Sequence, residues 1–190
     1  GSQGVSYAIP GAMYFTYARA PRLLDSVSPG SYPKYCGLEI LYSEQFPEEW
    51  QGSAITCDFR SHRIVQFSID EQGAGYAAQE QPELVRGLSN TFRPIDVKLG
   101  PDGALYVADW SNPIIQHGEV DFRDPRRDKA HGRIWRISYK DKALVKTPNL
   151  VDATDEALLD SLLSKNGYER HQARRVLTER GQTIRKTLNR

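Results

Sequence analysis

The sequence lacks three features that would each assign it to a class of protein. It has only two cysteines in 190 residues, which excludes a small domain held together by several disulfides. It has no apolar run of the roughly 20 residues that a membrane-spanning helix needs, and no secretory signal sequence is visible. A Cys-x-x-Cys-His motif is also missing, so attachment of a c-type haem to this segment is not expected.

An excess of charge of one sign is missing too. The chain has 25 Lys and Arg against 24 Asp and Glu, so its net charge of +1 gives no general attraction to nucleic acid or to an anionic membrane. Charged residues make up 26% and apolar residues 39%, which is ordinary for a globular protein. A chain of 190 residues suits one or two domains with a sizeable core.

The two cysteines, Cys36 and Cys57, fall in neighbouring predicted strands. This placement leaves two interpretations open. One is a single disulfide between them. The other, which we favour, is a pair of half-buried thiols that pack as small apolar side chains.

An internal repeat organises most of the chain. Each copy has an alternating strand, a turn, a second strand that ends in Asp and an aromatic residue, and a third strand that carries Arg-Ile. The first copy comprises residues 36–43, 52–59 and 62–69, and the second comprises 94–100, 103–110 and 131–139. Fourth strands are predicted at 76–80 and 143–146. Without insertions, each copy has the period of about 40–45 residues that is typical of a propeller blade.

These repeats predict a mainly β fold, a partial β-propeller of four-stranded antiparallel blades. The chain supplies two blades, or two and a half if the aromatic-rich segment 5–17 ends a preceding one. A propeller closes with at least about four blades, and repeat units bury their faces only against neighbours. We therefore expect residues 1–147 to be the C-terminal portion of a larger propeller.

Residues 148–190 have a helical pattern instead. Asp152 is predicted to cap a first helix, and Asn166-Gly167 to end it. That helix carries leucines on one face, namely Leu158, Leu159, Leu162 and Leu163. A second helix is predicted at about 168–180, with Ala173, Val176 and Leu177 turned inward, and a third near Gln182. Helices of this length predict the start of a HEAT-like repeat.

From residue 165 onward the tail has eight basic residues against two acidic ones. A basic helical face can bind nucleic acid, but this one lacks interleaved aromatic residues and any recognised motif. A solvated or protein-facing surface is the better interpretation.

A long charged insertion, residues 111–130, separates the second and third strands of the second copy. Long loops on rigid scaffolds are often functional. The candidate catalytic residues are His117 and His131, because an imidazole can take a proton from a sugar hydroxyl at neutral pH. His131 borders a strand and is better explained as a hydrogen-bonded structural residue.

The insertion also offers candidate ligands. Asp109, Asp124 and Asp128 provide carboxylates for a hard cation such as Ca²⁺. Candidate cofactor-binding residues are Arg123, Arg126, Arg127 and Trp110. The alternative, which we favour, is structural: the Asp-Pro-Arg-Arg-Asp cluster pairs with itself, Asp109 caps a turn, and Trp110 packs.

Four strings in this region resemble a known family. They are Phe92-Arg-Pro-Ile-Asp-Val-Lys-Leu-Gly-Pro-Asp-Gly-Ala-Leu-Tyr-Val-Ala-Asp-Trp110, Asn112-Pro-Ile-Ile115, Arg123-Asp-Pro-Arg-Arg-Asp128 and His131-Gly-Arg-Ile-Trp-Arg136. Together they resemble the last blade of bacterial membrane-bound dehydrogenases, propeller proteins similar to sorbosone and quinoprotein glucose dehydrogenases. The resemblance covers about residues 4–180 and is specific within 92–139.

The resemblance implies a sugar or alcohol dehydrogenase-like oxidoreductase, with Ca²⁺ and a PQQ-like quinone as cofactors. It also implies an exported, periplasmic parent chain with upstream blades, downstream helical repeats and a c-type cytochrome domain. No catalytic or quinone-binding residue of the glucose dehydrogenases can be matched to a position here, so none is carried over. The alternative function is a non-catalytic propeller that binds glycans or proteins.

Overall fold

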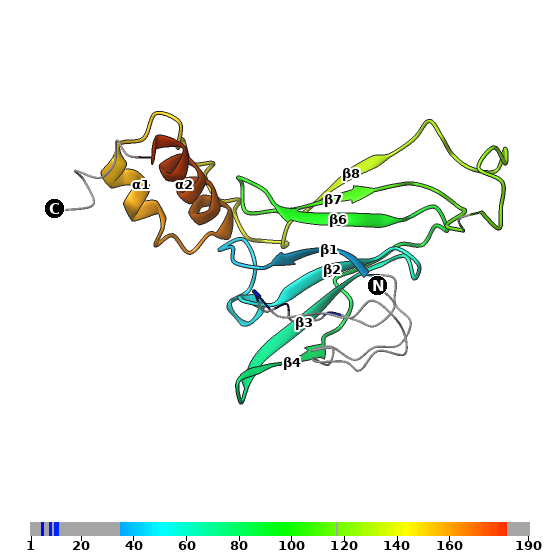
Figure 1. The fold of residues 1–190 in the computed structure, drawn as a ribbon, viewed down its shortest axis with the longest axis horizontal. Coiled ribbons are helices and arrows are strands. Elements are labelled where there is room, and N and C mark those ends of the chain that lie inside the picture. The colour runs from blue at the N-terminus through cyan, green and yellow to red at the C-terminus, as the bar shows by residue number, and fades with distance from the viewer. Residues whose placement is uncertain (1–4, 6–7, 9, 12–34, 117, 182–190) are drawn as a thin grey trace. The chain divides into compact units, whose positions relative to one another are not determined.

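The computed structural model of the chain describes residues 5, 8, 10–11, 35–116 and 118–181. These residues form two β-sheets, followed by two short α-helices (Figure 1). Neither sheet closes into a barrel within this part of the chain. The predicted mainly β class is confirmed. Most of segment 5–17, His117 and the third helix near Gln182 lie outside the described residues.

The first sheet contains every strand predicted for the first repeat. Its strands are β1 (Tyr35–Ile40), β2 (Ala54–Asp58), β3 (Arg63–Gln72), β4 (Gly75–Glu80) and β5 (Val85–Arg86). The order is β1-β2-β3-β4, with β5 pairing with β3. β3 is antiparallel to β2, β4 and β5. The two-residue strand β5 was not predicted, because it is too short to show an alternating pattern.

The second sheet differs from the prediction at its outer edge. The described part of the chain gives it three strands, β6 (Pro94–Leu99), β7 (Leu105–Asp109) and β8 (Arg133–Ile137), in that order. The fourth strand predicted at residues 143–146 was wrong, because these residues are described and are not in a strand. The chain turns at Asp141, where φ is 66°, and the Val145 N–H donates to the carbonyl oxygen of Asp102 at 2.9 Å.

The turn between β6 and β7 follows from its sequence. Gly103 has a φ of 80°, a conformation that costs glycine little, and its N–H donates to the Gly100 carbonyl. The Asp102 carboxylate accepts the Ala104 N–H at 3.1 Å, as aspartate commonly does in a turn. Pro-Asp-Gly therefore ends one strand and starts the next, as the sequence predicted.

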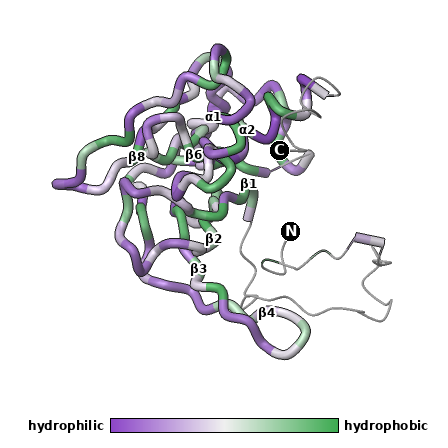
Figure 2. The backbone as a smooth tube through the Cα atoms, turned by 90° about the vertical axis from the view of Figure 1, so that its left-hand side faces the viewer, coloured by the Kyte–Doolittle hydropathy of each residue, from purple (hydrophilic) through white to green (hydrophobic). Residues whose placement is uncertain are grey.

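The chain divides into two compact units. The first comprises Gly1–Glu39, Ser53–Val97 and Val107–Trp135, and the second comprises Ile40–Gly52, Lys98–Tyr106 and Arg136–Arg190. Strands β1, β6, β7 and β8 pass from one unit into the other. The core of the first unit includes fully buried side chains of Ile55, Ile64, Val65, Val97 and Val107. Figure 2 shows hydrophobic residues along β2 and hydrophilic ones towards the turn from β3 to β4. The predicted domain boundary near residue 147 stays a prediction.

No disulfide joins Cys36 and Cys57. The Cys36 thiol lies 3.7 Å from the carbonyl oxygen of Cys57 and 3.6 Å from that of Pro94, within the first unit. Burial raises the pKa of the Cys36 thiol to about 11. Cys57 is fully buried. The favoured interpretation of two buried or half-buried thiols is therefore the one that the structure shows.

The first helix of the tail begins and ends differently from the prediction. Helix α1 (Asp155–Ser161) is capped by Thr154, whose hydroxyl accepts the Ala157 N–H, and not by Asp152. Leu163 lies beyond the end of α1 and is 86% exposed. Asn166 is the N-cap of helix α2 (Gly167–Arg180), so Asn-Gly begins the second helix and does not end the first.

The inward face predicted for α2 is confirmed. Ala173 and Leu177 are buried with Leu150 and Leu158, and Val176 packs at the edge of this cluster. Gly181, with a φ of 56°, ends the helix as predicted. Neither helix of the described residues combines the length and the apolar character needed to cross a membrane. The interpretation of this pair as a HEAT-like repeat stays a prediction.

Candidate functional site

The two repeat copies share an ion pair at the same position. Asp58 at the end of β2 pairs with Arg63 of β3 at 3.2 Å, and Asp109 at the end of β7 pairs with Arg133 of β8 at 2.8 Å. Both carboxylates are buried. Each pair fastens the end of a second strand to the start of the third. An aromatic residue follows each Asp, so the ion pairs also fix the backbone positions of Phe59 and Trp110.

Asp109 accepts three hydrogen bonds in addition to its ion pair. Its Oδ1 accepts the backbone N–H groups of Arg93 at 2.8 Å and Ser111 at 2.9 Å. Its Oδ2 accepts the indole N–H of Trp135 at 2.8 Å and faces the Arg133 guanidinium. These contacts hold the chain as it leaves β7 at Ser111, which has a φ of 55°. A buried carboxylate that meets four such partners is a structural anchor.

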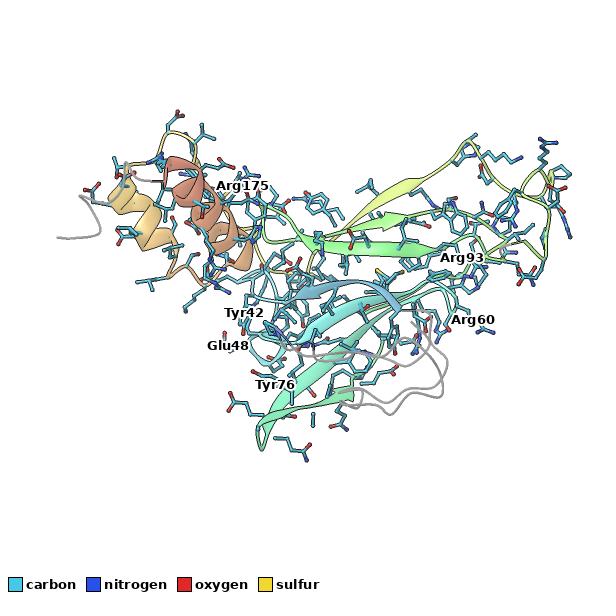
Figure 3. All side chains as sticks on the ribbon, in the orientation of Figure 1. Tyr42, Glu48, Arg60, Tyr76, Arg93 and Arg175 are labelled. Atoms are coloured by element: carbon cyan, nitrogen blue, oxygen red, sulfur yellow. The ribbon has the colours of Figure 1, made fainter. Side chains whose placement is uncertain are left out.

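Arg93 joins the loops that follow β2 and β7. Its guanidinium donates to the carbonyls of Phe59 at 2.9 Å and Arg60 at 3.2 Å on one side. On the other side it donates to Asn112 at 2.9 Å and Pro113 at 3.2 Å. The side chain is labelled in Figure 3, and the residue is 5% exposed. Burial lowers the pKa of this guanidinium, an effect that the Asp109 carboxylate opposes.

His62 extends this arrangement. Its Nδ1 lies 3.0 Å from the Phe92 carbonyl oxygen, and its Nε2 lies 3.3 Å from Nη1 of Arg93. A carbonyl can only accept and a guanidinium can only donate. We therefore assign the proton to Nδ1 and the accepting lone pair to Nε2.

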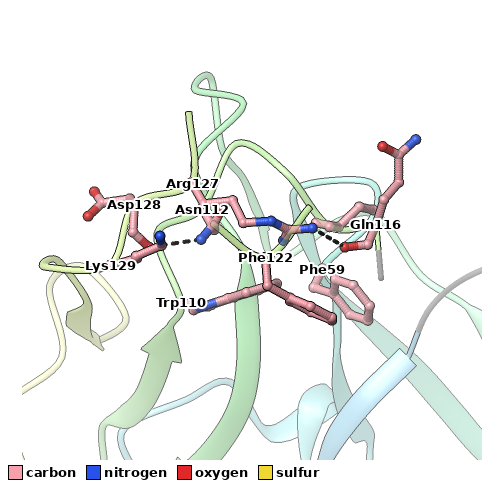
Figure 4. Close-up of a pocket in the computed structure, with 9 residues that line it drawn as sticks. Phe59, Trp110, Asn112, Gln116, Phe122, Arg127, Asp128 and Lys129 are labelled. Carbon is pink, nitrogen blue, oxygen red and sulfur yellow. Dashed lines mark hydrogen bonds between the residues drawn. The ribbon is translucent and has the colours of Figure 1, made fainter. Parts of the chain in front are cut away.

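A pocket of about 360 Å³ lies beside these loops in the first unit. Three aromatic side chains, Phe59, Trp110 and Phe122, contribute to its wall (Figure 4). The other lining residues are Asn112, Ile115, Gln116, Arg127, Asp128 and Lys129. Because Phe59 and Trp110 occupy the same position in the two repeat copies, the pocket is built on the repeat.

Arg127 supports the pocket from within the insertion. Its Nε donates to the Asp121 carbonyl at 3.0 Å, and its Nη2 donates to those of Gln116 at 2.7 Å and Val120 at 2.8 Å. The guanidinium also lies over the Phe122 ring, 5.3 Å from its centroid. A buried arginine with several carbonyl partners holds Gln116, Val120 and Asp121 in fixed positions.

The other predicted site residues lie on the surface of the insertion. Arg126 makes an exposed pair with Asp124 at 2.7 Å, and Arg123 is exposed as well. Hydrogen bonds from the Arg126 side chain and N–H hold the pKa of Asp124 at about 2. His131 is exposed, and its Nδ1 lies 2.9 Å from the Asp128 carboxylate. The backbone N–H groups of Ala130 and His131 help to lower the pKa of Asp128.

The structure does not gather the three predicted metal ligands. Among the described residues no group of three or more His, Cys, Asp and Glu side chains is placed to hold a metal ion. Asp109, Asp124 and Asp128 each accept a hydrogen bond from a backbone N–H group of the loop. Calcium takes six to eight oxygen ligands, about three times what any one of these groups could supply. The described residues therefore do not fit a Ca²⁺ site.

The family of the chain is shown by comparison with known domain families. Residues 8–141 match the family DUF7133, whose description is a domain of unknown function. The chain belongs to the DUF7133 family. The match includes both sheets and the whole insertion. No curated protein matches the chain.

One solved structure that resembles this DUF7133 chain comes from Thermus thermophilus, a protein provisionally named as an oxidoreductase (glucose dehydrogenase). The two are 22% identical, with a TM-score of 0.38. The match covers 70% of this chain and 33% of the other, so the chain spans about a third of that protein's length.

Three residues that shape the site of this DUF7133 chain were not predicted: Phe59, Arg93 and Phe122. The repeat itself held the signal for Phe59, because it aligns with Trp110. Phe122 is the one aromatic residue between positions 111 and 130, which is a weaker signal. Arg93 gave no signal, since its partners are backbone carbonyls from two separate loops.

Proposed function

We propose that this DUF7133 chain forms part of the propeller of an oxidoreductase-like protein, and that its 110–131 loop supplies a site for a small sugar-like or alcohol substrate. One observation carries the proposal. The two Asp-aromatic strand ends of the repeat open onto one pocket, which has the size of a small ligand site. In a propeller, such strand ends and the loops between them lie at one end of the blades.

The rigidity of the loop supports this proposal. The Asp109 and Arg93 contacts fix the backbone on which Phe59 and Trp110 stand. Arg127 fixes the segment that carries Phe122. A pocket wall held in this way loses little conformational entropy when a ligand binds, and binding sites are commonly preorganised in this manner.

In this scheme the described residues bind and orient the substrate. The one described histidine proposed as a base, His131, is tied to Asp128 on the surface and does not line the pocket. We assign proton abstraction and electron acceptance to parts of the protein outside the described residues, and His117 stays a candidate base. Upstream blades, a HEAT-like extension, a c-type cytochrome domain and export to the periplasm belong to the same proposal, and they rest on the family resemblance of the sequence.

Turnover measurements test the proposal. The intact protein is assayed with sugars and alcohols and a dye as electron acceptor, and Trp110→Leu is compared with the surface variant Arg126→Ala. We expect turnover of at least one sugar or alcohol, a KM raised by about tenfold in Trp110→Leu, and unchanged kinetics in Arg126→Ala. Identical kinetics in both variants would show that the substrate binds elsewhere.

A second function, a non-catalytic module that binds glycans or proteins, also has support in the structure. The aromatic residues Trp110 and Phe122 are exposed, and no imidazole of the described residues lines the pocket. Saturable glycan binding without turnover of any tested sugar or alcohol is the result that would favour this second function.

A further inference from the structure

The polar groups around the pocket face the loop and not the ligand space. The amide of Asn112 accepts the Ile114 N–H and donates to the Asp128 carbonyl, both at 3.0 Å. The Asp128 carboxylate accepts two backbone N–H groups and contacts the His131 ring. Figure 4 shows the Asp128 carboxylate and the Gln116 amide pointing away from the aromatic rings.

Two arginines of the insertion, Arg126 and Arg127, are engaged in the same way. Arg127 donates to three carbonyls, as described above. Arg126 donates two side-chain hydrogen bonds to Asp124, from Nε to Oδ1 at 2.9 Å and from Nη2 to Oδ2 at 2.7 Å. Lys129 is the other cation in the lining, and it is exposed beside the anionic Asp128. Among the described lining residues, Lys129 is thus the one cation that is not bonded within the loop, and the pocket has no cluster of cationic donors for an anionic ligand.

The pocket offers a ligand exposed aromatic ring surface. Trp110 is 39% exposed and Phe122 is 65% exposed, although Phe122 stands in a highly charged loop. Arg127 covers Phe122 from the loop side, which leaves ring surface for a ligand. A volume of about 360 Å³ is at the small end of the range for ligand pockets.

We propose that this pocket selects an uncharged, ring-shaped ligand through stacking on Trp110 and Phe122, and that it discriminates against anions. This inference rests on the proposed function, because it names the ligand class of the same site. The inference also implies that this pocket does not bind a quinone that carries carboxylates. Arg123, Arg126 and Arg127, which the sequence put forward as cofactor ligands, do not present donors for such a group here.

A matched pair of sugars tests the charge preference. D-Glucose and D-glucuronate share one pyranose ring and differ in a single carboxylate, and their affinities for the intact protein are measured by calorimetry or ligand-observed NMR. We expect glucose to bind at least about tenfold more tightly than glucuronate, because the anion loses hydration and can meet only the single solvent-exposed ammonium of Lys129. Equal or tighter binding of glucuronate would overturn the inference, as would the absence of glucose binding.

Substitutions test the stacking. Trp110→Leu and Phe122→Leu keep apolar volume but remove the ring, and each should weaken glucose binding by about three- to tenfold. Leu88→Ala removes a fully exposed apolar side chain that does not line the pocket, and Arg126→Ala removes an engaged cation. Both controls should bind glucose normally, with thermal melting used to confirm that every variant is folded. Normal glucose binding in both ring variants, or its loss in Arg126→Ala, contradicts the inference.

The two proposals fail separately in these experiments. Ring-dependent glucose binding without turnover removes the oxidoreductase function and keeps the ligand class. Turnover of a sugar whose binding is indifferent to Trp110 and Phe122 keeps the function and removes the ligand class.

Discussion

At the scale of single residues, the buried polar groups of the first unit hold neighbouring strands and loops together. Asp109 accepts hydrogen bonds from Arg93, Ser111 and Trp135 and forms an ion pair with Arg133. These residues lie just before β6, in β8 and in the loop that follows β7. Sequence analysis predicted that Asp109 could cap a turn, and the hydrogen bond from Ser111 confirms it. The same analysis could not reveal the Trp135 contact, because it joins residues of different strands.

Asp109→Asn tests the role of this carboxylate. The amide keeps the shape, but it loses the charge opposite Arg133 and turns an NH₂ group toward donors. We expect a loss of about 3 kcal/mol in the free energy of unfolding, the usual cost of breaking a buried ion pair, measured by urea denaturation of the intact protein. Asp124→Asn is the control, since its pair with Arg126 is exposed. A similar stability for the two variants would refute the anchoring role.

The Cys36 thiol should react slowly at neutral pH. Burial raises its pKa to about 11, so the thiolate, which is the reactive form, is scarce at pH 8 and grows in as the pH rises toward 11. We expect the rate of iodoacetamide labelling at Cys36 to increase by about tenfold per pH unit over that range, as followed by mass spectrometry. Rapid labelling already saturated at pH 8 is the contrary result.

At the scale of elements, strand patterns were predictable where they depended on local alternation and turns. The strands of the first copy and the Pro101-Asp102-Gly103 turn were found where expected. The role of Asn166 as the N-cap of α2 was not, because the contacts that place it there come from residues far away in the sequence. Asn166 exchanges hydrogen bonds with Glu44, through Oδ1 at 3.0 Å and Nδ2 at 2.9 Å, and the Gly167 N–H donates to Tyr42. The sequence pattern of the tail alone could not predict a contact with Glu44.

Two glycines provide a test of how closely β1 approaches β6 within the first unit. Gly37 and Gly73 have similar φ values, 64° and 59°. A Cβ on Gly37 would lie 2.7 Å from the Cα of Asp96, whereas one on Gly73 would meet nothing within 4 Å. Both alanine variants strain the backbone, by about 1 kcal/mol. Gly37→Ala should therefore lower the free energy of unfolding by about 2 kcal/mol more than Gly73→Ala, as measured in urea.

Equal losses in the two variants would mean that the backbones of β1 and β6 are not in close contact. The comparison does not depend on the exact cost of the left-handed conformation, because both positions share it. It tests the packing of one repeat copy on the next, on which the propeller proposal relies.

At the scale of the whole molecule, the repeat was the most informative part of the sequence. It predicted both sheets, and its Asp-aromatic positions held a signal for the pocket, although only Trp110 of the two aromatic residues was predicted as a site residue. The repeat could not predict the ligand class. The ligand class depends on which polar side chains of the insertion form hydrogen bonds within the loop and so are not available to a ligand. Ile134 on β8 is 71% exposed among the described residues. An uncovered apolar residue on an edge strand supports the proposal that further blades pack there.

The most direct test of the central claim is a crystal structure of the intact protein with bound D-glucose. Our account predicts a propeller in which the pyranose ring lies on the Trp110 indole, within about 4 to 5 Å, with Phe59 and Phe122 beside it and no arginine of the insertion bonded to it. A structure in which another part of the protein fills this pocket, and the sugar binds elsewhere, would contradict the account.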